Sequence, residues 1–336
     1  SAADGVEYFA DESSVFFRPY KTFDGKLNYL AFEVASYQPQ DGPESAIVQL
    51  EIAVNINVQE DPNTDFLEDV VVKLDNMSTR AHGWAGNDTF FASTGNDTID
   101  GGAGTDTAIY AGGATQFSIT INKTGAVKVQ DRTGAEGSDI LTSIEKIDFQ
   151  TGAKDVSLDV LDGVVNVSLA DLRAFIEIYI AYFNRAPDAI GLYFWASAFA
   201  SGLSLDAAAL EFFGQPETRE TYATALSPDG SELTNVSLFV ETVYSNVLGR
   251  AFDDAGRTFW IGELENGPTT PASFIRDIIA GAKVDAPDDA TQEFRDQLAA
   301  DAAYLETKAD LGAYFAVIKG LSDVADASSA MALYNG

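Results

Sequence analysis

Hydrophobic and polar residues alternate in the first part of the chain. Apolar side chains occupy every second position from residue 48 to residue 58, a period that predicts a long strand with one buried face. Shorter apolar runs at 15–17 and 27–34 are separated by turn sequences rich in Asp, Gly and Pro. The pattern predicts an antiparallel, β-sandwich-like segment over residues 1–62, followed by a linker over residues 63–80.

A nine-residue repeat comes next. Gly-Asn-Asp, Gly-Asn-Asp and Gly-Thr-Asp begin at Gly86, Gly95 and Gly104, each nine residues after the one before. About six residues of such a unit form a tight turn in which glycines take backbone angles that a β-carbon disfavours, and the others form a short strand with one inward apolar side chain. Stacked turns bring carboxylates and backbone carbonyls together, and Ca²⁺, which takes about six to eight oxygen ligands, satisfies such a column.

We therefore predict a calcium site in these turns. Its carboxylate ligands are Asp88, Asp97 and Asp106. Backbone carbonyls complete the predicted set, near Gly86, Asn87, Gly95, Asn96, Gly104 and Thr105. The alternative is that the three clusters are ordinary turns, and a threefold period of nine argues against it.

The repeat resembles the calcium β-roll of repeats-in-toxin (RTX) proteins, whose pattern G-G-x-G-x-D is complete in the third copy, at 101–106. The resemblance implies a short parallel roll that folds when it binds calcium. Trp84 and Ser93 replace the second glycine of the first two copies, and Ala108 places a small residue inside the third. We expect one to three ions, with the first and third copies facing each other across one of them.

Alternating segments at 117–121, 127–131 and 138–149 predict strands after the roll. The last contains Asp-x-Leu-x-x-Ile-Glu, which resembles an element that caps the roll of secreted RTX proteins, so we assign roll and cap to residues 81–160. Asp139 either supplies one more calcium oxygen or is a solvated or turn-capping side chain.

Helical spacing begins near residue 168 and predicts an all-α domain over 165–336. At a constant offset of 65 residues, the pattern Arg-x-x-Asp-x-x-Gly-x-x-Phe-Trp occurs twice, from Arg185 and from Arg250. It predicts two pseudo-repeats, at about 171–214 and 236–282, followed by C-terminal helices. We expect the arginines to bond carbonyls at a helix end, Asp188 and Asp253 to cap the next helices, and the tryptophans to anchor the packed faces. The alternative is that the two loops present a binding surface.

Two further resemblances concern the ends of the chain. Phe17-Arg18-Pro19 and Phe23-Asp24-Gly25, followed by the alternating strand, resemble part of a cadherin-like or immunoglobulin-like sandwich repeat of bacterial surface proteins. The duplicated helical pattern resembles an uncharacterised domain family of bacterial secreted and surface-layer-type proteins, which implies co-occurrence with RTX repeats and no biochemical role.

Composition restricts the chemistry. The 336 residues include 52 acidic and 20 basic side chains, a net charge of −32 that disfavours nucleic acid and anionic membrane surfaces as partners. The chain has no cysteine and one histidine, so thiolate catalysis and multi-histidine metal sites are excluded. No uninterrupted apolar run is long enough for membrane insertion. Catalytic motifs are absent, so we expect no enzyme activity, with carboxylate-only chemistry as the remaining alternative.

These inferences predict a multidomain β plus α protein with Ca²⁺ as its cofactor. We expect the non-enzymatic C-terminal region of a secreted, calcium-dependent bacterial cell-surface protein, an adhesin or surface-layer component, exported by a route resembling type I secretion. The chain begins without the basic and apolar architecture of a signal peptide, which fits such a route, a mature product or an excised fragment. The alternatives are a module that recognises a glycan, a peptide or a surface-protein partner, and the non-catalytic part of an RTX-type secreted enzyme.

Overall fold

The computed structural model describes residues 6–10, 15–19, 69–74, 76–152, 155–332 and 334. Contacts divide the chain into two units, Ser1–Ile56 and Asn57–Gly336. In the first unit, strands β1 (Val6–Ala10) and β2 (Val15–Pro19) pair antiparallel. The predicted strand at 15–17 lies in β2, whereas the predicted strands at 27–34 and 48–58 lie outside the described residues.

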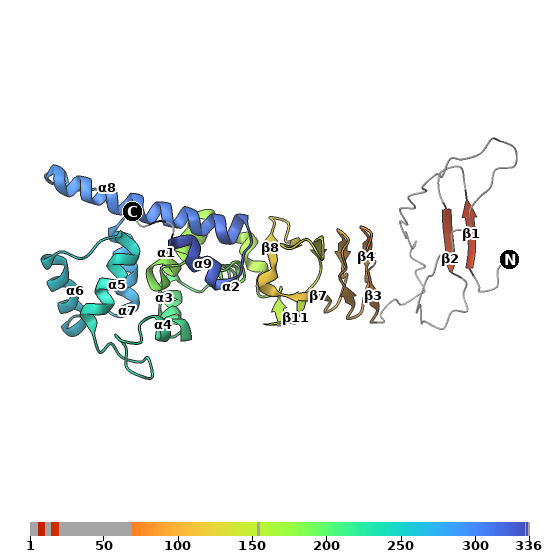
Figure 1. Cartoon of the computed structure of the whole chain (residues 1–336), viewed down its shortest axis with the longest axis horizontal. Helices are drawn as coiled ribbons and strands as arrows, with labels where there is room; N and C mark the ends of the chain where they lie inside the picture. Colours follow the sequence, from red (N-terminus) through yellow and green to blue (C-terminus); the bar gives the residue numbers. More distant parts are fainter. Residues whose placement is uncertain are drawn as a thin grey trace. The chain divides into compact units, whose positions relative to one another are not determined.

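The second unit begins with two five-stranded sheets, which Figure 1 shows as a stack of strands. One has the order β4-β6-β10-β9-β8 and the other β12-β11-β7-β5-β3. The strands are β3 (Val71–Lys73), β4 (Arg80–His82), β5 (Thr89–Phe91), β6 (Thr98–Asp100), β7 (Thr107–Gly113), β8 (Phe117–Ile121), β9 (Val127–Asp131), β10 (Ser138–Thr142), β11 (Lys146–Thr151) and β12 (Asp155–Ser157).

The repeat strands pair in parallel with a register of 18 residues. In the first sheet Arg80 is aligned with Thr98, and in the second Val71 is aligned with Thr89 and Thr89 with Thr107. One coil of the roll therefore contains two nonapeptides, one strand in each sheet, as expected from the repeat. Strand β3 and the first residue of β4 extend the roll into the segment that the sequence assigned to the linker, because backbone pairing does not require the Gly and Asp consensus that this segment lacks.

The inward position of each repeat strand fills the core between the sheets. Phe90, Ile99 and Ala108 are fully buried. The small Ala108 lies in a region where large aromatic rings supply the volume: the ring of Phe117 lies 5.1 Å from that of Tyr110 and 5.2 Å from that of Phe149. These rings come from the end of the roll and from the cap, so the cap completes the core of the roll.

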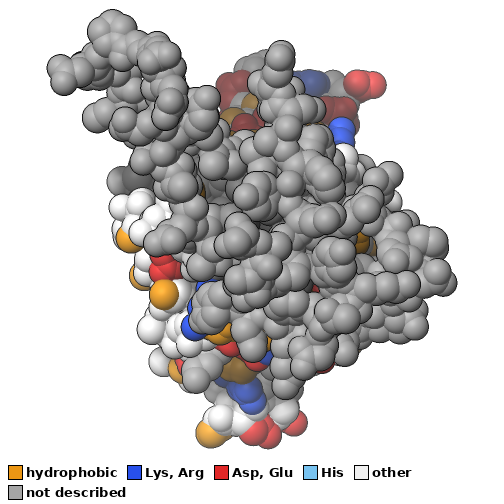
Figure 2. Space-filling model, turned by 90° about the vertical axis from the view of Figure 1, so that its right-hand side faces the viewer, with side chains coloured by type: hydrophobic (Ala, Val, Ile, Leu, Met, Phe, Trp, Pro, Cys, Tyr) orange, Lys and Arg blue, Asp and Glu red, His pale blue; other side chains and the backbone are white. Residues whose placement is uncertain are grey.

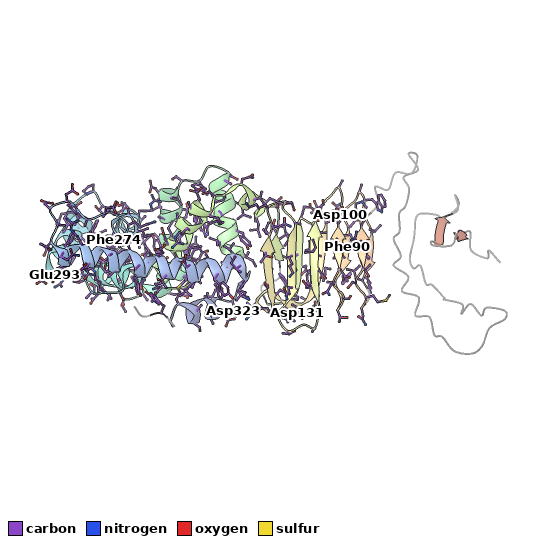
Figure 3. The ribbon with its side chains drawn as sticks, turned by 90° about the horizontal axis from the view of Figure 1, so that it is seen from above. Phe90, Asp100, Asp131, Phe274, Glu293 and Asp323 are labelled. Carbon is purple, nitrogen blue, oxygen red and sulfur yellow. The ribbon has the colours of Figure 1, made fainter. Side chains whose placement is uncertain are left out.

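The predicted cap forms. Strand β10 pairs parallel with β6 and antiparallel with β9, which in turn pairs with β8, while β11 pairs parallel with β7 and antiparallel with β12. The change from parallel to antiparallel pairing ends the repeat geometry in both sheets. Figure 3 shows these strands side by side, with Phe90 and Asp100 among the roll strands and Asp131 in the cap.

The C-terminal part is helical, as predicted. A short 3-10 helix, η2 (Asp162–Asn166), leads into it, and a π-helical turn, η3 (Tyr314–Ile318), follows the longest helix. The described α-helices are α1 (Leu169–Phe183), α2 (Ala189–Ala200), α3 (Leu205–Phe213), α4 (Pro216–Thr221), α5 (Val236–Leu248), α6 (Asp254–Asn266), α7 (Pro271–Gly281), α8 (Gln292–Ala313) and α9 (Val324–Ala332). None of the helices in the described ranges combines the length and hydrophobicity that crossing a membrane requires.

The two copies of the helical pattern have the same local structure. Asp188 caps α2 by accepting the N–H of Gly191 at 2.7 Å, and Asp253 caps α6 by accepting the N–H of Gly256 at 2.7 Å. Each tryptophan packs on a phenylalanine of its own repeat: the ring centres are 4.8 Å apart for Trp195 and Phe212, and 5.0 Å apart for Trp260 and Phe274.

The two arginines bind carboxylates as well as carbonyls. Arg185 is buried and forms two hydrogen bonds to Glu217, at 2.6 and 2.8 Å, and Arg250 forms two to Asp301, at 2.9 and 2.8 Å. Each also donates to a carbonyl just past the preceding helix. The sequence predicted bonds to the last carbonyls of the preceding helix, whereas the carbonyls bound are those of Ala186 and Ala251, which follow it. It also missed the acidic partners, which lie on α4 and α8, because nothing in the local pattern identifies them.

Helix α8 joins the two pseudo-repeats and lies along α1 and α5 (Figure 1). Its buried Lys308 donates to Asn184, which ends α1, and to the carbonyl of Asn246 near the end of α5, at 3.1 Å. The ammonium therefore lies at the negative ends of two helices. Burial lowers the pKa of Lys308 to about 8.

The helical part and the cap share backbone hydrogen bonds. The segment after η3 pairs with the edge strand β8 through a bridge between Ser118 and Leu321, and the N–H of Ile119 donates to the carbonyl of Gly320 at 2.8 Å. Arg132 and Asp326 add an ion pair at 3.0 Å. The cap therefore contacts the roll on one side and the helices on the other.

We expect Arg185→Ala to lower the free energy of unfolding by about 2–4 kcal/mol, because it leaves Glu217 without its buried partner. Arg276→Ala is the control: Arg276 pairs with the largely exposed Asp206, so its loss is expected to cost less than about 1 kcal/mol. Urea unfolding followed by helical circular dichroism measures both. Equal effects of the two variants would contradict the structural role of Arg185.

Candidate calcium site

Aspartate side chains link successive turns along one edge of the roll. The Oδ1 of Asp88 accepts the N–H of Val70 at 2.8 Å, and the Oδ1 of Asp106 accepts the N–H of Asp88 at 2.7 Å. Each bond spans 18 residues, so it joins turns of consecutive coils. We call this column the first carboxylate ladder. This register places the first and third copies in consecutive coils, and the predicted ion between them stays a prediction.

A second ladder runs along the opposite edge. The Oδ1 of Asp97 accepts the N–H of Thr79 at 2.8 Å, and the Oδ1 of Asp139 accepts the N–H of Asp97 at 2.8 Å. Asp139, from strand β10 of the cap, continues the ladder at the place where a further repeat would supply its aspartate. The structure thus divides the predicted carboxylates between two edges.

The first ladder holds buried negative charge. Asp88 and Asp106 are exposed by 1% or less, and the Oδ2 of each has no hydrogen-bond partner among the described residues. Burial raises the pKa of both carboxyls above the ordinary value, while the backbone N–H that each accepts opposes the shift. The nearby charge of Asp106 raises the pKa of Asp88 further. Such oxygens require either protons or a cation.

Glycine makes room for these oxygens. A β-carbon at Gly83 would collide with the Oδ2 of Asp88 and with the carbonyl oxygen of Gly101. Two acceptor oxygens from consecutive coils thus approach the same point, the arrangement that calcium requires. In the described ranges no three acidic or histidine side chains converge as a metal-binding group, so carbonyls must supply much of the coordination. Asp88 and the carbonyl of Gly101 fit the ion, next to the buried charge of Asp106 in the following coil.

The second ladder differs at the start of its turn. On this edge the turn begins at Ala92, whereas on the first edge the turns begin at Gly83 and Gly101. The N–H of Ala92 donates to the carbonyl of Ile109 in the neighbouring strand, as the N–H groups of the two glycines do to their neighbouring strands, so the three positions are equivalent. Ala92 therefore carries a methyl group at the position equivalent to Gly83, where the Asp88 carboxylate uses the space that glycine leaves open. For this reason we expect the first ladder to be the better calcium site.

The residues predicted to supply carbonyl ligands to calcium lie in the turns, and several of them contact the neighbouring coil. The Oδ1 of Asn87 accepts the N–H of Thr105 at 2.9 Å, and the N–H of Asn96 donates to Ser78 at 3.3 Å. The carbonyl of Gly86 lies against Gly104, and that of Gly95 lies against Gly137 of the cap. These residues hold the turns in register, and their role as ligands stays a prediction.

Asp139 is fully buried and both of its carboxylate oxygens are hydrogen-bonded. Its Oδ2 accepts the hydroxyl of Tyr110 at 2.9 Å. Burial raises the pKa of Asp139 to about 6, against the lowering effect of these bonds. The structure gives it the contacts of a capping side chain, and calcium ligation by it stays a prediction.

Comparison with protein-family models gives two matches. The RTX calcium-binding nonapeptide repeat, as a four-copy model, matches residues 82–116. The roll carries RTX calcium-binding repeats. The matched residues contain the turns of Asp88, Asp97 and Asp106, so calcium is the ion that these turns bind. RTX repeats of this kind are typical of secreted proteins.

The second match is a domain of unknown function (DUF4214) at residues 223–279. It covers α5, α6 and most of α7, the second of the two pseudo-repeats. The comparison with curated protein sequences gave no match.

Sequence reasoning missed Gly83 and Gly101 as the residues that open the first site. The repeat pattern emphasised the glycines two residues before each aspartate. The space beside the first turn position becomes evident only when consecutive coils are stacked. The available signal was the spacing of 18 between Gly83 and Gly101, combined with Ala92 at the intermediate position.

We expect Asp88→Asn to weaken calcium binding by about tenfold or more, because it removes a buried charge that the ion offsets. Asp148→Asn, in strand β11 of the cap, is the matched control and should bind calcium like the wild type. Calcium titration calorimetry of the full chain measures both. Unchanged affinity in Asp88→Asn would contradict the assignment of the first ladder.

Proposed function

We propose that this chain is a non-enzymatic, calcium-dependent region of a secreted bacterial cell-surface protein, an adhesin or surface-layer component. The observation that carries the proposal is the pair of buried carboxylates, Asp88 and Asp106, each with an oxygen that has no hydrogen-bond partner in the described structure. Such a pair is costly to bury without a cation, so calcium binding contributes directly to the free energy of folding.

The ion concentration then decides where the roll folds. Inside a cell, where free calcium is low, the repulsion between stacked carboxylates opposes the roll, and the chain stays suited to export. Outside, at about millimolar calcium, weak sites of the extracellular type are filled and the roll closes. The RTX match supports this reading, since such repeats are typical of secreted proteins.

The contacts of the cap support a role in surface architecture. Calcium orders the roll, the roll shares its core with the cap, and the cap bonds the helical part through β8 and Gly320. Folding of the roll therefore stabilises the cap and, through it, the segment around Gly320 in the helical part. Acidic side chains are visible among basic and hydrophobic ones on the described surface in Figure 2, consistent with a solvated exterior.

The placement of the acids supports a non-enzymatic role. In the described residues, burial raises the pKa of several carboxyls along the roll, its cap and η2, namely Asp88, Asp106, Asp139, Glu145 and Asp162. Asp88, Asp106 and Glu145 lie in turns of the first ladder, and Asp139 lies in strand β10, where it ends the second ladder. Their perturbation follows from the ladders rather than from a catalytic cleft.

Labelling of intact cells that produce the protein tests the surface role. We expect an antibody against the folded RTX roll to label cells in millimolar calcium and to lose its epitope after chelation, because the roll unfolds. An antibody against a linear epitope in α8 controls for release of the protein from the cell. Labelling only after the cells are permeabilised would contradict the proposal.

A second function, recognition of a glycan or peptide by the helical part, is favoured by one observation. Phe194 and Phe259, at equivalent positions of the two pseudo-repeats, are 44% and 56% exposed, although each contacts the partly buried tryptophan that follows it. An exposed ring at the same place in both copies provides a pair of apolar contacts. The arginines of the same motif serve the fold, so the phenylalanines are the candidates for binding.

If this second function is correct, a glycan and peptide screen of the full chain should give a ligand whose affinity falls by about tenfold in the variant with both Phe194→Ala and Phe259→Ala. Phe294→Ala is the matched control, since Phe294 is similarly exposed on α8 but lies outside the motif. A ligand bound equally by all three proteins would exclude the phenylalanine pair as its site.

A further inference from the structure

The first carboxylate ladder continues beyond the RTX repeats into the cap. The N–H of Asp106 donates to the Oε2 of Glu145 at 2.7 Å, as the N–H of Asp88 donates to the Oδ1 of Asp106 one coil earlier. Glu145 belongs to the turn between β10 and β11, which has no nonapeptide sequence. In the ladder, Glu145 takes the place of the next repeat aspartate.

The start of that turn is equivalent too. The N–H of Gly83 donates to the carbonyl of Asp100 at 2.9 Å, and the N–H of Gly101 donates to the carbonyl of Thr142 at 3.0 Å. Ser143 therefore follows Thr142 as Gly101 follows Asp100. The cap turn runs from Ser143 to Glu145, and its first and last residues take the places of the first and last residues of an RTX turn. Ser143 has a left-handed backbone, with φ of 48°, and Glu145 replaces the repeat aspartate.

The space between Gly101 and this turn repeats the geometry of the first site. A β-carbon at Gly101 would collide with the Oδ2 of Asp106 and with the carbonyl oxygen of Ser143, just as one at Gly83 would collide with the Oδ2 of Asp88 and the carbonyl of Gly101. The Asp106 side chain is fully buried, and this oxygen has no hydrogen-bond partner among the described residues. The buried carboxylate oxygen and the carbonyl oxygen therefore approach the same point beside Gly101.

The surrounding charge is negative. Glu145 accepts the backbone N–H of Asp106, and the carboxylates of Asp106 and Asp159 act on it as like charges. The adjacent cation, Lys146, is already paired with Asp155 at 3.0 Å. A divalent cation would offset this concentration of charge.

We propose that Asp106, the carbonyl of Ser143 and Glu145 form a second calcium site, at the junction between the RTX roll and its cap. Only Asp106 of these three residues belongs to the glycine-rich repeats, because Ser143 and Glu145 come from the cap. The ion ties the connection between β10 and β11 to the last RTX turn, so that cap docking as well as roll folding depends on calcium. The inference rests on the calcium-dependent folding proposed above.

Counting bound calcium in the full chain tests this site. Calorimetric titration with calcium chloride, checked by metal analysis after gel filtration, gives the number of ions and their affinities. Glu145→Gln keeps an oxygen that can accept the N–H of Asp106 but removes the charge, and we expect it to bind one ion fewer than the wild type below 1 mM calcium. Glu136→Gln is the matched control, because the Oε2 of Glu136 also accepts a backbone N–H, that of Ala111 at 3.0 Å, away from the first ladder.

Two glycine variants fill the two spaces separately. Gly101→Ala should remove the same ion as Glu145→Gln, so that combining the two changes causes no further loss. Gly83→Ala fills the other space, so combining it with Glu145→Gln should remove two ions. Helical circular dichroism verifies that each variant is folded.

The outcomes distinguish the two proposals. A wild-type chain that binds no calcium would overturn calcium-dependent folding and the junction site together. A wild-type chain that binds calcium, with Glu145→Gln retaining every ion at an affinity within twofold, would overturn the junction site alone. Loss of an ion in Glu136→Gln equal to that in Glu145→Gln would also overturn it, because the effect would then not depend on the ladder.

Discussion

Burial of like charges in a stacked column is the constraint on which the calcium-binding part of this protein depends. Asp88 and Asp106 are inside the turns because their Oδ1 atoms hold the coils in register, and that placement leaves their second oxygens without a partner in the described structure. Register and charge are therefore inseparable: the bonds that align the coils also concentrate the negative charge. A cation resolves the conflict, since it converts the repulsion between coils into shared coordination.

The two edges of the roll show how one side-chain atom alters this balance. Gly83 and Gly101 leave space that a carboxylate and a carbonyl oxygen occupy, whereas Ala92 begins the turn on the other edge. On that edge Asp139 closes the ladder with a hydrogen bond from Tyr110. The same repeat thus supports an ion site along one edge and a hydrogen-bonded end along the other.

The helical part uses duplication differently. Both copies of its motif cap a helix with aspartate and pack a partly buried tryptophan against a phenylalanine, but their surroundings diverge. Leu192 of α2 is fully buried in the helical part that packs on η2 and β8, whereas Arg257, 65 residues later on α6, is exposed. The first copy contacts the cap and the second presents a polar face to solvent. The two copies therefore share their local structure but differ in what they contact.

Local pattern alone determined the nine-residue turns, the strands of the cap, the helices and their caps at Asp188 and Asp253, because each depends on residues within one or two turns of chain. Only the tertiary structure decided that β3 belongs to the roll and that Arg185 and Arg250 bind Glu217 and Asp301. It also decided that Gly83, Gly101 and Glu145 lie at the proposed ion sites. These contacts join residues 18 to 51 positions apart in the chain. Spacing along a sequence predicts which residues share a turn or a helix face, but which oxygen faces which glycine is set by how the coils and helices stack.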